Sequence, residues 1–340
     1  MNDFSHLKAW LELPDETKLN IFSETSRAVG LPVAAIEKDW WVTHTLSIIF
    51  SMECAPALVF KGGTSLSKGW GLIERFSEDI DLALDKEHLG FEDPLSNRAV
   101  ERLRQSCYQF VTTRFAEEFQ AKFAEAGFPN ISIKCLNDPK FDKDPVTVEI
   151  LYPSLTETTP YLKPRLLVEI VSRSLKEPFS NRTIGTWVAE KFADRPFSDK
   201  PIEIPTVNPE RTLLEKIFLL HEEFQKDPEK IRVERLSRHL YDIEKLSQTE
   251  FAGKALQNAD LYKTIVTHRA KFNAIQGVNY ANHSPDKITF IPPGHLLTDW
   301  ETDYHQMREN MIYGDALNFA DLIQKLTALQ NQINGISWEK

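Results

Sequence analysis

The sequence has 340 residues, of which 41% are hydrophobic and 26% are charged. This composition is that of an ordinary globular protein, and the length favours two domains over one. The net charge of −10 argues against an extended, non-specific coat on nucleic acid, although a local basic groove is compatible with that total.

No apolar run approaches the roughly 20 residues that cross a bilayer, and the amino terminus lacks the basic and apolar regions of a secretory signal. Cys54, Cys107 and Cys135 are scattered and form no CxxC pair. Such a set is typical of reduced thiols rather than of a disulfide frame or a zinc site. We therefore expect a cytoplasmic protein that has no membrane partner.

The first segment, from about residue 7 to residue 50, is predicted to be helical. Helix starts are indicated at Pro14-Asp15-Glu16 and Leu31-Pro32. A short apolar run over residues 57–60 then ends at Gly62-Gly63, which predicts a buried strand that enters a tight turn. A short helix is expected over residues 64–73, and a second strand over residues 80–84.

Further along, residues 97–126 have the apolar periodicity of one long amphipathic helix. Strands are predicted over residues 131–136, 146–152 and 165–172. A cluster of prolines, Pro201, Pro205 and Pro209, marks a change of composition, and the chain beyond it is mostly helical. We expect an α/β (α+β) fold with amino-terminal helices and a mixed sheet over residues 1–205, and a mainly helical domain over residues 206–340.

The chemistry is concentrated around the first turn. Alternation along a strand places Asp79 and Asp81 on one side, where two carboxylates can share one or two divalent cations. Ligands that are all oxygen suit Mg²⁺, or Mn²⁺ in its place. The glycines of the turn let backbone N–H groups approach a triphosphate closely. Alone, a Gly-Gly pair is usually just a turn and Asp-x-Asp often decorates a strand edge, so the conjunction of the two is the signal.

Other polar residues near the turn are candidates for nucleotide binding. Thr64 and Ser65 can add hydroxyl donors, and Arg75 could bind phosphate or brace a carboxylate. The full candidate set for the nucleotide is Lys61, Gly62, Gly63, Thr64, Ser65, Arg75 and Ser77.

Two stretches in this region resemble a known family. They are Phe60-Lys-Gly-Gly-Thr-Ser-Leu-Ser-Lys68 and Arg75-Phe-Ser-Glu-Asp-Ile-Asp-Leu82. They are similar to the AbiEii-type nucleotidyltransferase toxins, which include the MenT-like enzymes and belong to the DNA polymerase β-like nucleotidyltransferase superfamily. Glu37-Lys38-Asp39-Trp40 also resembles the amino-terminal helical signature of this family.

The superfamily resemblance implies a third metal-binding carboxylate on a later strand. Glu169 is the best candidate, because its apolar neighbours would bury an unpaired acid at high cost. Glu149 is the second candidate. Either acid could instead be an ordinary outward residue of its strand.

In the helical half, the segments beginning at Asn208 and Arg235 resemble the carboxy-terminal motifs of the family. The resemblance implies a lysine on the nucleotide phosphates and an aspartate that completes the site, which correspond to Lys216 and Asp242. Asp242 could orient Lys216 or act as a general base, and an ion pair with Arg238, four residues away, is the simpler alternative. A basic run indicates either a solvated helix surface or a groove for RNA; it comprises Arg211, Lys226, Lys230, Arg232, Arg235 and Arg238.

The function expected from these features is metal-dependent transfer of a nucleoside monophosphate from a nucleoside triphosphate to an acceptor hydroxyl. The catalytic candidates are Asp79, Asp81, Lys216 and Asp242, and the metal candidates are Asp79, Asp81 and Glu169. We expect the helical domain to close over the cleft that holds them. The family resemblance implies that the acceptor is the 3′ end of tRNA and that an antitoxin is encoded alongside. A protein hydroxyl as acceptor, and a nucleotide-binding module without turnover, are the alternatives.

Overall fold

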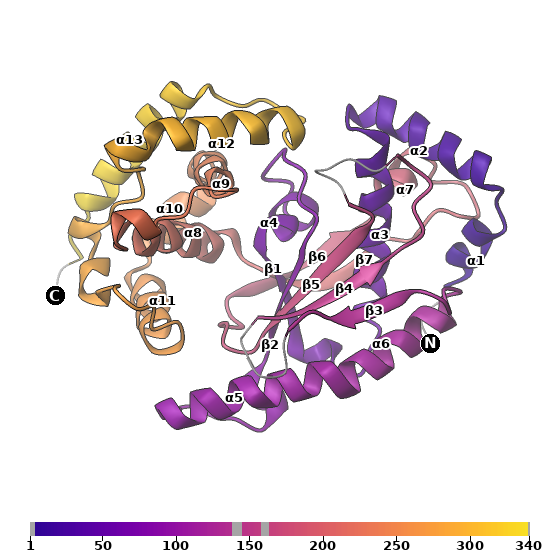
Figure 1. The fold of residues 1–340 in the computed structure, drawn as a ribbon, viewed down its shortest axis with the longest axis horizontal. Helices are drawn as coiled ribbons and strands as arrows, with labels where there is room; N and C mark the ends of the chain where they lie inside the picture. Colours follow the sequence, from indigo (N-terminus) through magenta and orange to yellow (C-terminus); the bar gives the residue numbers. More distant parts are fainter. Residues whose placement is uncertain (1–3, 138–144, 158–162, 339–340) are drawn as a thin grey trace. The chain divides into compact units, whose positions relative to one another are not determined.

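The computed structural model describes residues 4–137, 145–157 and 163–338. The chain divides into two compact units (Figure 1). The first, here the sheet unit, comprises Met1–Gly69 and Phe76–Val207, and the second, here the helical unit, comprises Trp70–Arg75 and Asn208–Lys340. The division thus follows Val207, and a short segment that precedes the acid pair belongs with the carboxy-terminal helices.

The sheet unit is built on a mixed sheet of seven strands in the order β3-β4-β5-β2-β1-β7-β6. The strands are β1 (Leu58–Lys61), β2 (Ile80–Leu84), β3 (Ser132–Cys135), β4 (Val146–Leu151), β5 (Arg165–Val171), β6 (Phe179–Ile184) and β7 (Ile202–Val207). The pairs β2–β5 and β1–β7 are parallel, and the remaining pairs are antiparallel. The predicted α/β class is confirmed, and the five predicted strands occur within one or two residues of their expected bounds.

Helices pack around this sheet (Figure 1). They are α1 (Ser5–Leu11), α2 (Asp15–Val29), α3 (Val33–Ile49), α4 (Gly62–Thr64), α5 (Asn97–Phe110), α6 (Ala116–Glu125) and α7 (Trp187–Lys191). A π-helical segment, Val111–Phe115, joins α5 to α6, so that residues 97–125 form one continuous helix as expected. Its apolar stripe is buried at Leu103, Cys107 and Phe119.

The chain divides after Val207, two residues from the boundary expected near residue 205, and β6 and β7 are strands that the sequence pattern does not predict. Pro205 does not lie in a linker. Pro205 instead lies inside β7, where it pairs with Asn181 of β6. Strand β7 lies between β1 and β6 and pairs with β1 at Thr206, and Pro205 beside it has no N–H to donate to the ladder.

The helix expected over residues 64–73 was too long. Residues 62–64 form α4, and a π-helical segment, Ser65–Gly69, follows it. Residues 70–74 have no regular structure, and Arg75 forms an isolated bridge with Ile312.

The helical unit contains α8 (Pro209–Phe224), α9 (Ser237–Ser247), α10 (Glu250–Gln257), α11 (Ala259–Phe272), α12 (Leu297–Asn310) and α13 (Phe319–Asn334). Pro209 is the first residue of α8, a position where its missing N–H is not needed. Leu213, Leu214 and Ile217 of α8 are buried, which fixes the direction of the polar side chains between them. Within the described residues, no helix is both long and apolar enough to cross a membrane.

Candidate functional site

The Gly-Gly turn and the acid pair are packed against each other in the sheet unit. Strand β1 ends at Lys61, which lies opposite Asp81 of the antiparallel strand β2. Gly62 follows with φ of +81°, and a Cβ atom there would lie only 1.9 Å from Oδ2 of Asp81. The Asp81 carboxylate therefore occupies space that only a glycine leaves open. Backbone conformation and close approach both require glycine at this position.

The hydroxyl groups after the turn have structural partners. Thr64 and Ser65 are fully buried. Thr64 Oγ1 donates to the carbonyl of Asp79 at 2.6 Å and lies 3.0 Å from the hydroxyl of Ser77, while Ser65 Oγ donates to the carbonyl of Gly62 at 2.8 Å. These contacts hold the turn against Asp79, the first residue of the acid pair. They favour the backbone N–H groups, rather than these hydroxyls, as donors to a phosphate.

Three acidic residues lie on the half-exposed face of the central strands. Asp79 directly precedes β2 and Asp81 lies within it, and both side chains are half-buried. In the parallel neighbour β5, Glu169 is in register with Asp81. Glu149 lies one strand further, where Arg165 forms an ion pair with it at 2.8 Å. The register therefore favours Glu169 over Glu149 as a third acid.

The donor set fits a hard divalent cation, because Asp79 and Asp81 offer only carboxylate oxygens and Mg²⁺ completes its shell from water and triphosphate. Among the described residues, no group of three or more His, Cys, Asp or Glu side chains converges as a preformed metal site. The support for Glu169 is thus its register with Asp81 rather than a preassembled cluster.

The helical unit holds a buried cluster of charges around Asp242. Arg75 donates from Nε to Oδ1 and from Nη2 to Oδ2 of Asp242, both at 2.7 Å, and Lys216 Nζ lies 2.8 Å from Oδ2. The exposed fractions of Arg75, Lys216 and Asp242 are 2%, 7% and 0%. The segment that carries Arg75 is fixed in this unit by the carbonyl of Glu74, which accepts from the backbone N–H of Tyr313 at 3.0 Å. Of the two roles considered for Arg75, this geometry shows the bracing of a carboxylate.

The charge state of this cluster follows from its surroundings. Burial opposes ionisation of Asp242, but the charges and hydrogen bonds of Arg75 and Lys216 outweigh it and hold the pKa of the carboxyl well below its usual value. Burial lowers the pKa of the Lys216 ammonium, and the Asp242 carboxylate offsets part of that effect. An ionised carboxylate whose two oxygens both accept charged hydrogen bonds is a weak proton acceptor at neutral pH. The geometry therefore favours orientation of Lys216 over a general-base role for Asp242.

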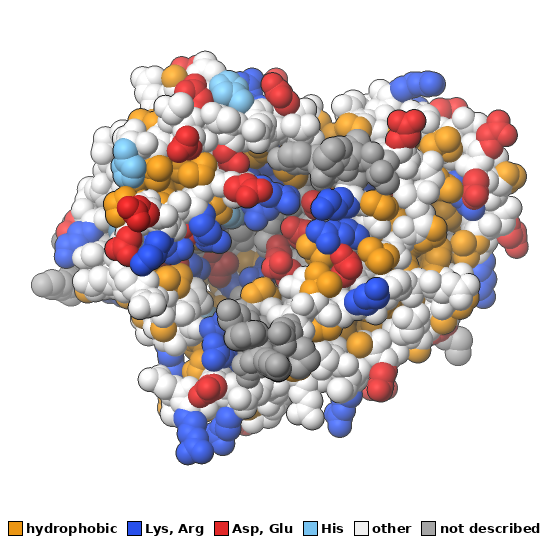
Figure 2. All heavy atoms as spheres, in the orientation of Figure 1, with side chains coloured by type: hydrophobic (Ala, Val, Ile, Leu, Met, Phe, Trp, Pro, Cys, Tyr) orange, Lys and Arg blue, Asp and Glu red, His pale blue; other side chains and the backbone are white. Residues whose placement is uncertain are grey.

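The basic run of the helical unit is largely matched by acids. Arg211 is fully buried and pairs with Glu215 at 2.9 Å. Lys226 and Arg232 both contact Glu223, and Lys230 pairs with Asp227. Figure 2 shows blue and red side chains interspersed over the face that it draws. These pairs weaken the interpretation of the run as a groove for RNA.

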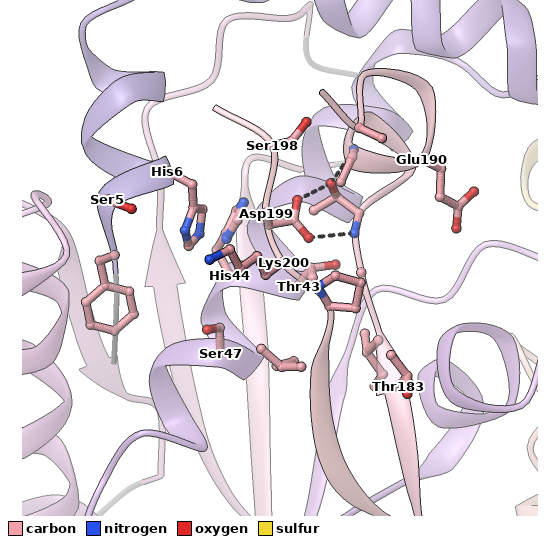
Figure 3. Close-up of a pocket in the computed structure, with 18 of the residues that line it drawn as sticks. Ser5, His6, Thr43, His44, Ser47, Thr183, Glu190, Ser198, Asp199 and Lys200 are labelled. Atoms are coloured by element: carbon pink, nitrogen blue, oxygen red, sulfur yellow. Dashed lines mark hydrogen bonds between the residues drawn. The ribbon is translucent and has the colours of Figure 1, made fainter. Parts of the chain in front are cut away.

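A separate cavity of about 1040 Å³ lies in the sheet unit. Residues of the amino terminus, α3, β6, α7 and β7 line it (Figure 3). His44 there is buried, its Nε2 atom has no hydrogen-bond partner in the described part of the chain, and burial lowers its pKa to about 3. Asp199 accepts from the backbone N–H of Thr186 at 3.1 Å.

This cavity lies away from the acid pair. It is lined by Ile202 and Ile204 at the start of β7, whereas the Gly-Gly turn follows the end of β1, which runs parallel to β7. The starts and ends of parallel strands lie at opposite edges of a sheet. None of the residues predicted for the site lines the cavity, and we assign it no part in nucleotidyl transfer.

Comparison with known proteins bears on these two groups of residues. The profile of the family described as "Nucleotidyl transferase AbiEii toxin, Type IV TA system" matches residues 48–325. The chain belongs to this family. The match includes the Gly-Gly turn, the acid pair, Glu169, Lys216 and Asp242, and it confirms the family resemblance noted in the sequence. The protein is thus a nucleotidyltransferase of a toxin–antitoxin family.

Comparison with curated proteins finds no match. A solved structure, "Crystal structure of JHP933 from Helicobacter pylori", is similar at 16% sequence identity over 89% of this chain and 93% of that chain, with a TM-score of 0.39.

Proposed function

We propose that the protein transfers a nucleoside monophosphate from a nucleoside triphosphate to an acceptor hydroxyl and releases pyrophosphate. The observation that carries this proposal is the Asp81 carboxylate, held in the space left by Gly62 at the end of β1. This packing supports the proposal, because it brings a carboxylate, a group that can bind a metal ion, directly beside a turn whose backbone N–H groups can donate to phosphate. Transfer of this kind depends on positioning and charge neutralisation more than on covalent chemistry.

Each group in the sheet unit has a proposed task. Asp79 and Asp81 hold a divalent cation, Mg²⁺ or Mn²⁺, and Glu169 is the third acid. When bound, the cation neutralises charge on the triphosphate and on the attacked α-phosphate. The backbone of Gly62 and Gly63 hydrogen-bonds phosphate oxygens, and the hydroxyls of Thr64 and Ser65 keep the turn in place.

In the helical unit we propose that Lys216 adds positive charge for the triphosphate. Asp242 orients its ammonium, since the two groups are only 2.8 Å apart. Arg75 in turn fixes the plane of the Asp242 carboxylate through two parallel hydrogen bonds. The attacking hydroxyl then loses its proton to water or to a group other than Asp242.

For the acceptor we propose the 3′ end of tRNA. The support is the membership in a toxin family, because a nucleotide added there would block aminoacylation and hence growth. The pairing of the basic run with acids removes one argument for RNA, so a protein hydroxyl is the second candidate. The family also implies an antitoxin, which would relieve the growth arrest.

The test is incubation of the full chain with each labelled nucleoside triphosphate, a divalent cation, and either total RNA or cell protein. We expect label at RNA 3′ ends and release of pyrophosphate, and neither product from Asp81→Asn. Label in protein and never in RNA would replace the tRNA proposal by the protein one. Binding of triphosphate without pyrophosphate from any acceptor would identify a non-catalytic module, and growth arrest that persists with Asp81→Asn would exclude the proposed site.

A further inference from the structure

Helix α3 (Val33–Ile49) carries charges in an unusual place. Every residue from Ala35 to Leu46 is buried, yet three consecutive residues of this stretch are Glu37, Lys38 and Asp39, with exposed fractions of 1%, 2% and 3%. Charged side chains are rarely buried without partners, because desolvation is expensive. Consecutive residues of an α-helix point about 100° apart, so these three side chains reach three different parts of the sheet unit.

Lys38 reaches the segments that lead into two strands. Its ammonium donates to the carboxylate of Glu78 and, at 3.0 Å, to the carbonyl of Lys163. Glu78 precedes Asp79 and lies two residues before β2, and Lys163 likewise lies two residues before β5. These are the parallel neighbours in which Asp81 and Glu169 are in register. One ammonium therefore ties together the starts of both strands that carry the acids.

Asp39 reaches the segment that follows the Gly-Gly turn. Its carboxylate accepts from the ammonium of Lys68 and, at 3.2 Å, from the backbone N–H of Trp187. Lys68 lies in the π-helical segment that continues α4, and its side chain is 9% exposed. The turn is thus anchored to α3 at its far end, while Thr64 anchors it to the acid pair.

Glu37 completes the set. Its carboxylate accepts from the hydroxyl of Ser154 and the backbone N–H of Leu155, both at 2.7 Å, and from the N–H and hydroxyl of Thr156. These residues follow β4, the neighbour of β5. Glu37 therefore holds the segment after β4, as Lys38 holds the segments before β2 and β5 and Asp39 holds the segment after the Gly-Gly turn.

We propose that Lys38 and Asp39 are positioning residues for nucleotidyl transfer. Lys38 fixes the spacing of the acids on β2 and β5 through Glu78 and Lys163, and Asp39 fixes the Gly-Gly turn through Lys68. Neither acts on the substrate itself. This inference rests on the proposed function of Asp79 and Asp81.

The test compares Lys38→Met with Lys18→Met in the full chain. Lys18 is a matched control, since it is a lysine of the same unit that pairs with a carboxylate, Asp15, at 3.0 Å. Binding of a non-hydrolysable nucleoside triphosphate with Mg²⁺ is measured by calorimetry, and turnover by pyrophosphate release. Lys38→Met is expected to weaken binding about tenfold and to slow turnover about a hundredfold, the effect of a misplacement near 1 Å. Lys18→Met should change both by less than about twofold.

A second comparison separates the effect of the Lys38–Glu78 ion pair on binding from a general loss of stability of the chain. Lys38→Glu places two acids together, and the exchanged pair Lys38→Glu with Glu78→Lys restores one acid and one base. The exchanged pair is expected to bind the analogue at least about tenfold more tightly than Lys38→Glu alone, which is the usual size of a coupling between contacting charges. Thermal unfolding of each variant is measured in parallel. An exchanged pair that folds but binds no better than the single variant overturns the positioning role.

Failure of the proposed function and failure of the positioning role of Lys38 give different results. If the wild-type chain and Asp81→Asn both release no pyrophosphate with any acceptor, the proposed function is wrong. If the wild-type chain is active, Asp81→Asn is inactive and Lys38→Met matches Lys18→Met in binding and turnover, only the role of Lys38 is wrong.

Discussion

Replacement of Gly62 by alanine tests the packing on which the functional proposal depends. The new Cβ atom would lie 1.9 Å from Oδ2 and 2.8 Å from Cγ of Asp81, whereas ordinary contact begins near 3.4 Å. The carboxylate must therefore retreat by about 1.5 Å, the difference between the two contact distances for Oδ2. Misplacement by about 1 Å costs roughly a hundredfold in rate, so we expect at least that loss of turnover.

Backbone strain adds a separate effect on stability. An alanine held at φ of +81° loses about 1 to 2 kcal/mol relative to glycine. Gly90→Ala is the matched control, because Gly90 has φ of +80° in the same unit and no atom within 4 Å of its added Cβ. The control should lose similar stability and keep its activity.

Turnover of both variants is measured by pyrophosphate release, and their stability by urea unfolding. The expected result is a loss of stability shared by the two alanines and a loss of turnover confined to Gly62→Ala. Wild-type turnover in Gly62→Ala, or an equal loss in Gly90→Ala, would refute the assignment of Asp81 as a group held by the turn.

Three further predictions concern single residues. Glu169→Gln should reduce turnover at least about tenfold whereas Glu149→Gln should not; equal effects in the pyrophosphate assay would remove the third-acid assignment. Arg75→Leu should destabilise the chain by about 3 kcal/mol in urea unfolding, because it deprives the buried Asp242 carboxylate of two hydrogen bonds, and a change below about 1 kcal/mol would contradict this. Burial lowers the pKa of His221 from 6.5 to about 4. As the pH falls, the histidine therefore binds a proton in the unfolded chain before it does so in the folded chain. The folded state should lose up to about 3 kcal/mol of stability between pH 6.5 and pH 4 for this reason. His221→Gln should flatten that part of the stability profile measured by unfolding at several pH values, and an unchanged slope would be evidence against it.

Strands were predictable where alternation was clean. In β4, Val146, Val148 and Ile150 are buried and the residues between them are not, which is the period-two pattern that the sequence displays. In β6, most residues of Phe179–Ile184 are partly or fully exposed, so no such pattern exists. In β7, the prolines are typical of a linker, but the segment forms a strand because it pairs with β1 and β6.

The part of the candidate site that could be predicted is the part whose residues lie close together in the sequence. The spacing of Gly62-Gly63 and the acid pair lies within one stretch of sequence, and the structure packs Gly62 against Asp81. Residue types alone could not reveal that the hydroxyls of Thr64 and Ser65 point into the protein. The sequence singles out Lys38 only within a family resemblance, because its partners Glu78 and Lys163 lie 40 and 125 residues away.

Arg75 shows why proximity in sequence is a weak guide to a shared ligand. Only residues 76–78 separate it from Asp79, which made it a candidate for the same phosphates. Its partner is instead Asp242, 167 residues away, and the surrounding segment belongs to the helical unit. The Arg75 guanidinium is only 2% exposed and two of its N–H groups donate to the buried Asp242 carboxylate, which balances its charge, so it is poorly placed to bind a phosphate. Loss of Arg75 should therefore appear first as lost stability of the Asp242 and Lys216 cluster, and only through that cluster as lost activity.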